Sequence, residues 1–199
     1  MSLSIFPTAY FGNISYFAAL VNSQSPLIEA KEHFVKQTIR TRCSILGANG
    51  IQQLSIPVIR SNGSKTNMED VLVSTNDPWQ KIHWRSIESA YASAPFFEEY
   101  DKEVKNLIFQ KETNLLRFNH RITKEIMQLL DIEIDLNHTF YYDLNEKTLD
   151  FRMKDFEKPI DMKKYIQVFG VSGNFSANLS ILDLLFCEGP MARKWIINS

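Results

Sequence analysis

The chain has 199 residues, of which 44% are hydrophobic, 23% charged and 12% aromatic, with only seven Gly and seven Pro. This length predicts one domain that spans residues 1–199, and the composition excludes a disordered, collagenous or low-complexity protein. The 22 Lys and Arg nearly balance the 23 Asp and Glu, for a net charge of −1. We therefore expect no nucleic-acid partner and no general attraction to an anionic membrane.

The cysteines and the first residues bear on the compartment. Cys43 and Cys187 are too few for a disulfide framework, and we expect both to be free thiols. The start, MSLSIFPTAYF, has no basic region before an apolar stretch, so no signal peptide is predicted. The longest strongly apolar stretch, Ala177 to Cys187, is too short for a membrane span. These features predict a cytoplasmic protein.

The first half of the chain predicts a short helix, several strands and one hairpin. We expect a helix over Phe11–Val21 and a strand over Ser25–Ala30. The β-capable runs TRCSIL and IQQLSIPVI stand on either side of a turn at Gly47–Gly50, which predicts a hairpin. Pro57 places the second strand at a sheet edge or ends it there. A further strand is expected over Asp70–Ser74.

Three helices are expected next. Asp77 can cap the first of them and Pro78 suits its first position, while Pro95 ends it. The other two are predicted over Phe96–Phe109 and Asn114–Leu130, where apolar residues recur at helical spacing. One side of the first helix carries Trp79, His83, Trp84, Ile87, Tyr91 and Ala94.

The last third of the chain predicts strands at Thr139–Tyr142 and Tyr165–Phe169, then an apolar helix over Leu179–Phe186. A hairpin and helices without a regular strand–helix alternation indicate an α+β fold rather than a doubly wound sheet. We expect a single domain in which a sheet containing the β-hairpin packs against several helices.

Five segments carry a family resemblance. They are FPTAYFGNISYFAAL, HFVKQTIRTRCSI, LSIPVIR, KIHWRSIESAYASAPFFEEY and YIQVFGVSGNFSANLSILDLLFCEGP. In this order they resemble the bacterial WbqC-like protein family over nearly the whole chain. The family commonly shows an acidic pair before the second segment, where this chain has Lys31, Glu32 and His33.

The resemblance implies a pathway and a reaction class. Genes of this family are often found with O-antigen and other surface-polysaccharide genes, and some members are named as glycyl or aminoacyl transferases acting on amino sugars. For this chain the resemblance therefore implies a transferase that joins an aminoacyl, glycyl or other acyl group to an amino sugar. A non-catalytic sugar- or carrier-binding protein of the same pathway is the alternative.

A basic cluster is the densest polar feature of the sequence. Arg40 and Arg42 are two residues apart, so on a strand they share a face and can hold one carboxylate or diphosphate. Such a clamp, with Lys36 and His33 nearby, suits a small-molecule substrate such as a nucleotide-sugar or a carrier-bound acyl donor. The alternative is a solvated edge strand whose basic residues discourage pairing with another chain.

His83 is the candidate general base. It lies within the aromatic side of its helix, where partial burial can bring its pKa near the operating pH. The alternative is a core histidine that donates one hydrogen bond to a carbonyl. Tyr91 on the same side orients a substrate or belongs to the core. The candidate catalytic residues are His83 and His33, and the candidate substrate-binding residues are Arg40, Arg42, Lys36 and Tyr91.

Asp183 interrupts LSILDLLF, which is apolar on every side and predicts a buried helix. Its carboxylate is expected to form a structural ion pair with Arg40 or Arg42, or else to orient His83.

The sequence gives little support for a cysteine nucleophile, a metal site or a phosphate-binding loop. Neither Cys43 in a hairpin strand nor Cys187 at the end of an apolar helix is in a setting that lowers a thiol pKa. The four histidines show no metal-ligand spacing, and the glycines form no phosphate-binding loop. We expect no metal and no cofactor.

Overall fold

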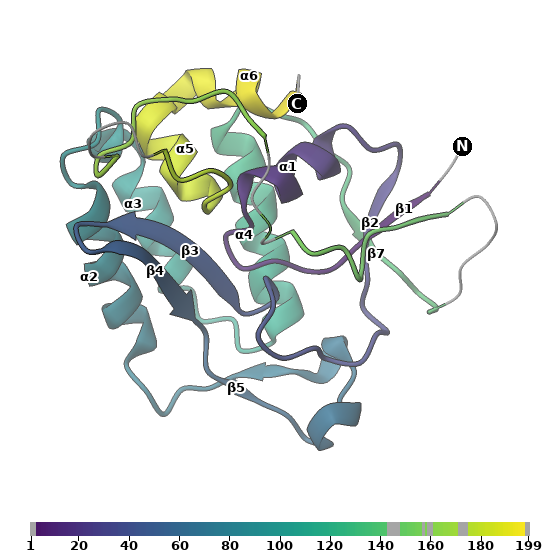
Figure 1. Cartoon of the computed structure of the whole chain (residues 1–199). Coiled ribbons are helices and arrows are strands. Elements are labelled where there is room, and N and C mark those ends of the chain that lie inside the picture. The colour runs from purple at the N-terminus through teal and green to yellow at the C-terminus, as the bar shows by residue number, and fades with distance from the viewer. Residues whose placement is uncertain (1–2, 143–147, 157, 159–160, 171–174, 198–199) are drawn as a thin grey trace.

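A four-stranded parallel sheet joins two strands from the start of the chain with two strands from residues 137–150 (Figure 1). In the computed structural model, which describes residues 3–142, 148–156, 158, 161–170 and 175–197, its strand order is β7-β2-β1-β8. The strands are short: β1 is Ser4–Phe6, β2 Pro26–Ile28, β7 Asn137–His138 and β8 Leu149–Asp150. Strand β1 pairs in parallel with β2 and with β8, and β2 pairs in parallel with β7.

Helix α1 (Ile14–Val21) makes the crossover that parallel strands β1 and β2 require. Asn13 begins the helix, because its side chain accepts a hydrogen bond from the backbone N–H of Tyr16. The helix starts three residues later than the predicted Phe11–Val21. Its residues are apolar nearly all round, so α1 is buried, and Figure 1 shows α5 and α6 lying beside it.

The predicted hairpin is present as β3 (Arg42–Gly47) and β4 (Gly50–Ser55), paired from Arg42–Ser55 to Gly47–Gly50. A second small ribbon pairs β5 (Val58–Ile59) with β6 (Leu72–Val73) and contains the shorter strand expected near Asp70–Ser74. Cys43 and Ile45 on one face of β3 are buried, so the hairpin packs that face on the helices.

The long helices agree closely with the apolar periodicity. They are α2 (Trp79–Tyr91), α3 (Phe97–Ile108) and α4 (Leu115–Leu129), and Asn114 caps α4 through the backbone N–H of Arg117. Helix α2 begins without a side-chain cap, so the expected role of Asp77 is wrong; Pro78 occupies the cap position instead. The chain ends with α5 (Ile181–Glu188), a 3₁₀ turn at Gly189–Met191 and α6 (Ala192–Ile197).

The structure is α+β, as the sequence indicates, but two predicted strands are wrong. The strand expected over Thr139–Tyr142 lies earlier, at Asn137–His138, and Phe140, Tyr141 and Tyr142 are exposed. The segment Tyr165–Phe169 forms no strand; the side chains of Tyr165 and Gln167 hydrogen-bond to Asp183 instead. The parallel sheet is not predicted by the sequence pattern.

Candidate active site

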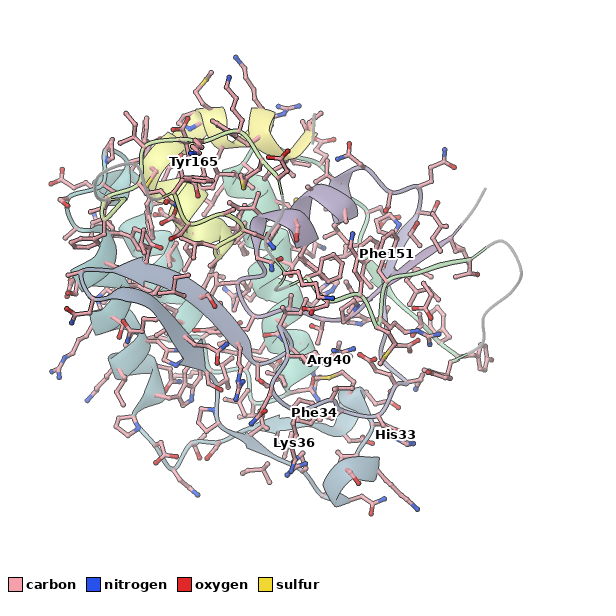
Figure 2. All side chains as sticks on the ribbon, viewed as in Figure 1. His33, Phe34, Lys36, Arg40, Phe151 and Tyr165 are labelled. Atoms are coloured by element: carbon pink, nitrogen blue, oxygen red, sulfur yellow. The ribbon has the colours of Figure 1, made fainter. Side chains whose placement is uncertain are left out.

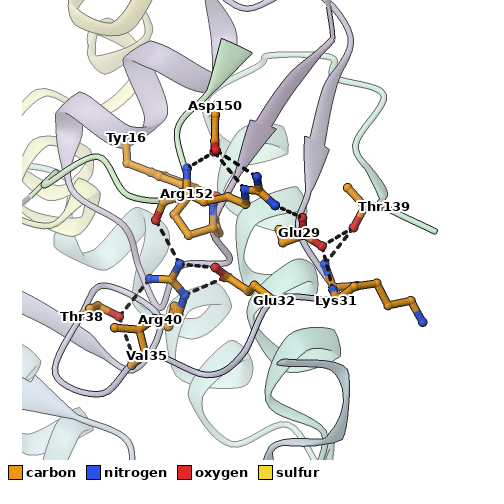
Figure 3. Close-up of polar contacts among 12 residues, drawn as sticks. Tyr16, Glu29, Lys31, Glu32, Val35, Thr38, Arg40, Thr139, Asp150 and Arg152 are labelled. Atoms are coloured by element: carbon orange, nitrogen blue, oxygen red, sulfur yellow. Dashed lines mark hydrogen bonds and ion pairs between the residues drawn. The ribbon is translucent and has the colours of Figure 1, made fainter. Parts of the chain in front are cut away.

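Polar residues follow the four parallel strands where each one ends. Thr8 comes two residues after β1, Glu29 directly after β2, Thr139 directly after β7, and Arg152 two residues after β8. Because parallel strands end at the same edge of a sheet, these residues gather at one edge, as Figure 3 shows for Glu29, Thr139 and Arg152. This edge is where open parallel sheets bind their ligands.

A cavity of about 300 Å³ opens at this edge. In chain order, β1 connects to β2 on one side, whereas β8 pairs with β1 on the other side. The strand order therefore reverses between β1 and β8, and the crevice outside such a switch point is a recurrent ligand site. We call this the switch-point cavity; its walls include Pro7, Thr38, Arg40, Arg152, Lys154 and Phe156.

Arg40 forms a buried two-point ion pair at the wall of this cavity. Its Nε and Nη2 atoms each donate to one oxygen of Glu32 at 2.7 Å (Figure 3). The same guanidinium donates to the hydroxyl of Thr38 at 3.2 Å and to the carbonyl of Arg152 at 3.1 Å. The Arg40 side chain is only 3% exposed, so its position is fixed by these acceptors.

Arg152 is the second buried cation, and it is held between two carboxylates. Its Nη1 donates to Glu29 at 2.9 Å, and its Nε and Nη2 donate to the two oxygens of Asp150 at 2.9 Å. The other oxygen of Glu29 accepts from the hydroxyl of Thr139 at 2.6 Å and from the backbone N–H of Lys31 at 2.7 Å. The ring of Tyr142 stacks under the Arg152 guanidinium.

The two buried arginines pair with three carboxylates, of which Glu29 and Glu32 are buried and Asp150 is 33% exposed. Burial raises the pKa of the Glu32 carboxyl, while its hydrogen bonds from Arg40 act against that rise. Hydrogen bonds from Arg152 lower the pKa of Asp150. The cavity lining itself carries three cations, Arg40, Arg152 and Lys154, and one carboxylate, Asp155, so the walls are predominantly basic.

Gln37, which also lines the switch-point cavity, has a left-handed backbone with φ of 59°. A residue with a Cβ is strained in this region, but Asp131 after α4 has a similar φ of 54°, so the strain alone does not single out this cavity. A second cavity of about 430 Å³ lies beyond the end of α4, but its walls come from one short stretch, 124–134. No buried ion pair is found in that stretch. The switch-point cavity is therefore the candidate active site.

Comparison with known proteins assigns the chain to a family. The profile of the WbqC-like protein family matches residues 8–172, which include every residue of the two ion-pair groups. The chain belongs to the WbqC-like protein family. It is also similar to a Mycobacterium tuberculosis protein named uncharacterized protein Rv1507c, with 26% identity over an alignment that covers 91% of each chain. No solved structure matches it.

The arrangement of Arg40 and Arg42 in this WbqC-like protein differs from the sequence prediction. Strand β3 begins at Arg42, and Arg40 lies in the preceding turn, where the backbone N–H groups of Thr41 and Arg42 donate to the Thr38 carbonyl. The two arginines therefore do not share a strand face. Arg40 lines the switch-point cavity, whereas Arg42 lines a different one, and the predicted joint clamp is wrong.

His83 lies away from the switch-point cavity, in the aromatic core. Its Nδ1 is 2.9 Å from the hydroxyl of Tyr10, and the rings of Trp79 and Tyr10 pack around it. Burial lowers its pKa to about 4, although a hydrogen bond to the Ser55 carbonyl acts in the opposite direction. Tyr91 is fully buried and its hydroxyl accepts from the Leu46 backbone N–H, so it too lies in the core.

The remaining predicted residues are also separated from one another. His33 and Lys36 are exposed, and Figure 2 shows both toward the lower edge of the view, below Arg40. Asp183 is fully buried but has no arginine partner among the described residues. Its Oδ2 accepts from the Tyr165 hydroxyl at 2.6 Å and from the Gln167 amide at 2.9 Å. Burial raises the pKa of Asp183.

Burial of His83 predicts a stability that falls in acid. Above pH 6.5 the imidazole is neutral in the folded and the unfolded chain. Between pH 6.5 and about 4 only the unfolded chain binds the proton, so stability is lost as the pH falls. We expect the free energy of unfolding of the wild type, relative to His83→Gln, to drop by about 3 kcal/mol over this range. Urea unfolding at several pH values measures this, with His33→Gln as the exposed control; parallel curves for wild type and His83→Gln would contradict it.

Among the described residues, the cysteines and histidines form no second candidate catalytic or metal site. Cys43 and Cys187 are free and buried, and burial raises the pKa of both thiols, to about 12 for Cys187. In the part of the chain described here, no three His, Cys, Asp or Glu side chains gather as metal ligands. His120 and His138 meet as a pair, with ring centres 4.4 Å apart. None of the described helices is both long and apolar enough to cross a membrane.

Sequence reasoning missed Glu29, Asp150 and Arg152, and it gave no role to Glu32. Glu29 and Arg152 are 123 residues apart, and each stands next to a strand of only two or three residues. The one local signal was the mixed charge of Lys31-Glu32-His33 beside an apolar strand, since a carboxylate there needs a partner when the strand is buried.

Proposed function

We propose that this protein binds an amino sugar in the switch-point cavity and transfers an acyl group to it during synthesis of surface polysaccharide. The supporting observation is that the carboxylate of Asp155 lines this cavity together with three cations, Arg40, Arg152 and Lys154. The ammonium group of an amino sugar can pair with that carboxylate, and the cations suit an anionic acyl donor.

The rest of the cavity is compatible with a sugar. Hydroxyl groups both donate and accept hydrogen bonds, so walls that combine amide, hydroxyl and guanidinium groups suit them. Gln37 and Thr38 supply such groups, and Val35 and Phe156 give apolar surface for the C–H face of a ring. The volume of about 300 Å³ is within the range of small-molecule sites.

The reaction is the one implied by family membership. The bound ammonium first releases one proton to bulk water, and the resulting free amine attacks the carbonyl carbon of an activated acyl ester or thioester, forming a C–N bond. The bond from that carbon to the oxygen or sulfur of the donor breaks, and the leaving group departs with its electron pair. The nitrogen loses one proton, and Asp155, a carboxylate in the cavity lining, can accept it.

The carboxylate of Asp155 in the cavity lining predicts that the amine is recognised. We expect glucosamine to bind about tenfold or more tightly than N-acetylglucosamine, because acetylation removes the ammonium charge that Asp155 stabilises. Isothermal titration calorimetry at pH 7 measures both affinities. Gln37→Gly should weaken glucosamine binding while stability stays within about 1 kcal/mol of wild type, since glycine relieves the left-handed strain. Equal affinities for the two sugars would contradict the proposal.

A non-catalytic sugar- or carrier-binding role is the second candidate. The observation that favours it is the burial of His83 away from the switch-point cavity, which removes the predicted general base. Mass spectrometry of glucosamine incubated with the protein and a glycyl thioester distinguishes the two. An N-glycyl product formed faster than without protein supports the transferase; sugar binding without product supports the binding protein.

A further inference from the structure

Arg42 shares its face of β3 with Ser44, two residues further along the strand, and not with Arg40 as predicted. Arg42 and Ser44 line a cavity of about 130 Å³ with Asn13, Asn178 and Ile39. Arg42 is half-buried, and its guanidinium has no acceptor among the described residues. It thus differs from Arg40 and Arg152, which are each bound by carboxylates.

The two asparagine side chains of this small cavity are already hydrogen-bonded. The amide nitrogens of Asn13 and Asn178 both donate to the Phe156 carbonyl. The Asn178 side-chain oxygen accepts from the Ser15 backbone N–H at 2.9 Å. The lining therefore has a rigid frame and one cation with unused donors, and a planar guanidinium with two parallel N–H groups is suited to phosphate.

The small cavity adjoins the switch-point cavity. Ile39 lines both of them, and Phe156, whose carbonyl the two asparagines hold, lines the switch-point cavity. A ligand with a sugar in one cavity and an anionic group in the other would straddle Ile39.

We infer that the Arg42 cavity is an anion subsite and that the amino sugar enters this protein as a phosphate ester. Arg42 provides the paired donors, and the Ser44 hydroxyl on the same strand face provides another. The inference rests on the proposed function only for the sugar part of the ligand. The anion subsite itself is independent of it, because it follows from the unpaired cation.

The direct test uses inorganic phosphate as the probe, by ³¹P NMR titration of the full chain. Wild type should bind phosphate, and Arg42→Gln should bind it about ten- to a hundredfold more weakly. Arg85→Gln, which removes an exposed cation of α2, has the same net charge and should bind as wild type does. No phosphate binding by wild type, or equal binding by Arg42→Gln, would overturn the subsite.

A second titration separates this inference from the proposed function. Glucosamine 1-phosphate should bind wild type about tenfold or more tightly than glucosamine does, and Arg42→Gln should abolish this gain without changing the affinity for glucosamine. If the wild type bound glucosamine but bound glucosamine 1-phosphate no more tightly, only the phosphate ester would be contradicted. Failure of glucosamine to bind at all would contradict the proposed function, while the result with inorganic phosphate would still decide the anion subsite.

Discussion

Arg40→Met is expected to lower the free energy of unfolding by about 3–5 kcal/mol, the largest effect of any single change considered. Both oxygens of Glu32 accept from Arg40, and the Glu32 side chain is only 6% exposed. Without the guanidinium, a carboxylate would stay buried with no compensating charge. Urea unfolding at pH 7 measures the loss.

Two further variants distinguish the effect of losing a buried ion pair from that of losing a solvent-exposed one. Arg193→Met removes a cation whose pair with Asp131 is exposed, and it should cost less than about 1 kcal/mol. Arg40→Met with Glu32→Leu removes both charges and should recover most of the stability. A loss for Arg40→Met as small as that for Arg193→Met would show that Glu32 is not an uncompensated buried charge in the variant.

Gly189→Ala is expected to cost about 3 kcal/mol, the other large effect. Gly189 ends α5 with φ of 53° and ψ of −129°, a conformation that is strained for any residue with a Cβ. A Cβ here would also overlap the ring of Phe96, whose backbone N–H donates to Phe186 in the same helix. Thermal and urea unfolding measure the change.

Gly63 provides the matched control, since it has the same φ of 53° but open space around the position of a Cβ. Gly63→Ala should therefore cost only the backbone strain, about 1 kcal/mol. Similar losses for Gly63→Ala and Gly189→Ala would exclude the clash with Phe96 as a cause of destabilisation.

The sequence predicts those elements whose stability depends on local patterns. Helices α3 and α4 repeat apolar residues over 12 and 15 residues, which is enough for a clear helical period, and the β3–β4 hairpin has its turn between two apolar runs. The parallel strands have two or three residues each, too few for any period, and two of their three pairings join segments more than 100 residues apart. Parallel pairing of this kind therefore cannot be predicted from a single sequence.

For the candidate site as well, the sequence identifies individual residues but not the distant contacts that they make. Arg40 and Arg42 are visible as candidates in the sequence, but the turn before β3 separates them into two cavities. Helical spacing places His83 on the inward side of α2, and this position is compatible with a catalytic role as well as with a role in the core. Only the partners of a side chain distinguish the two roles, and for His83 these are Tyr10 and Trp79.

The central claim, that the switch-point cavity is the ligand site, is tested most directly by mapping where glucosamine binds. Amide ¹H–¹⁵N spectra recorded during a titration should show shifts concentrated in the turn at 35–40 and in residues 152–156, which together line the cavity. The stretch 124–134, which lines the larger cavity beyond α4, should not shift. Shifts confined to 124–134, or none at saturating sugar, would contradict the account.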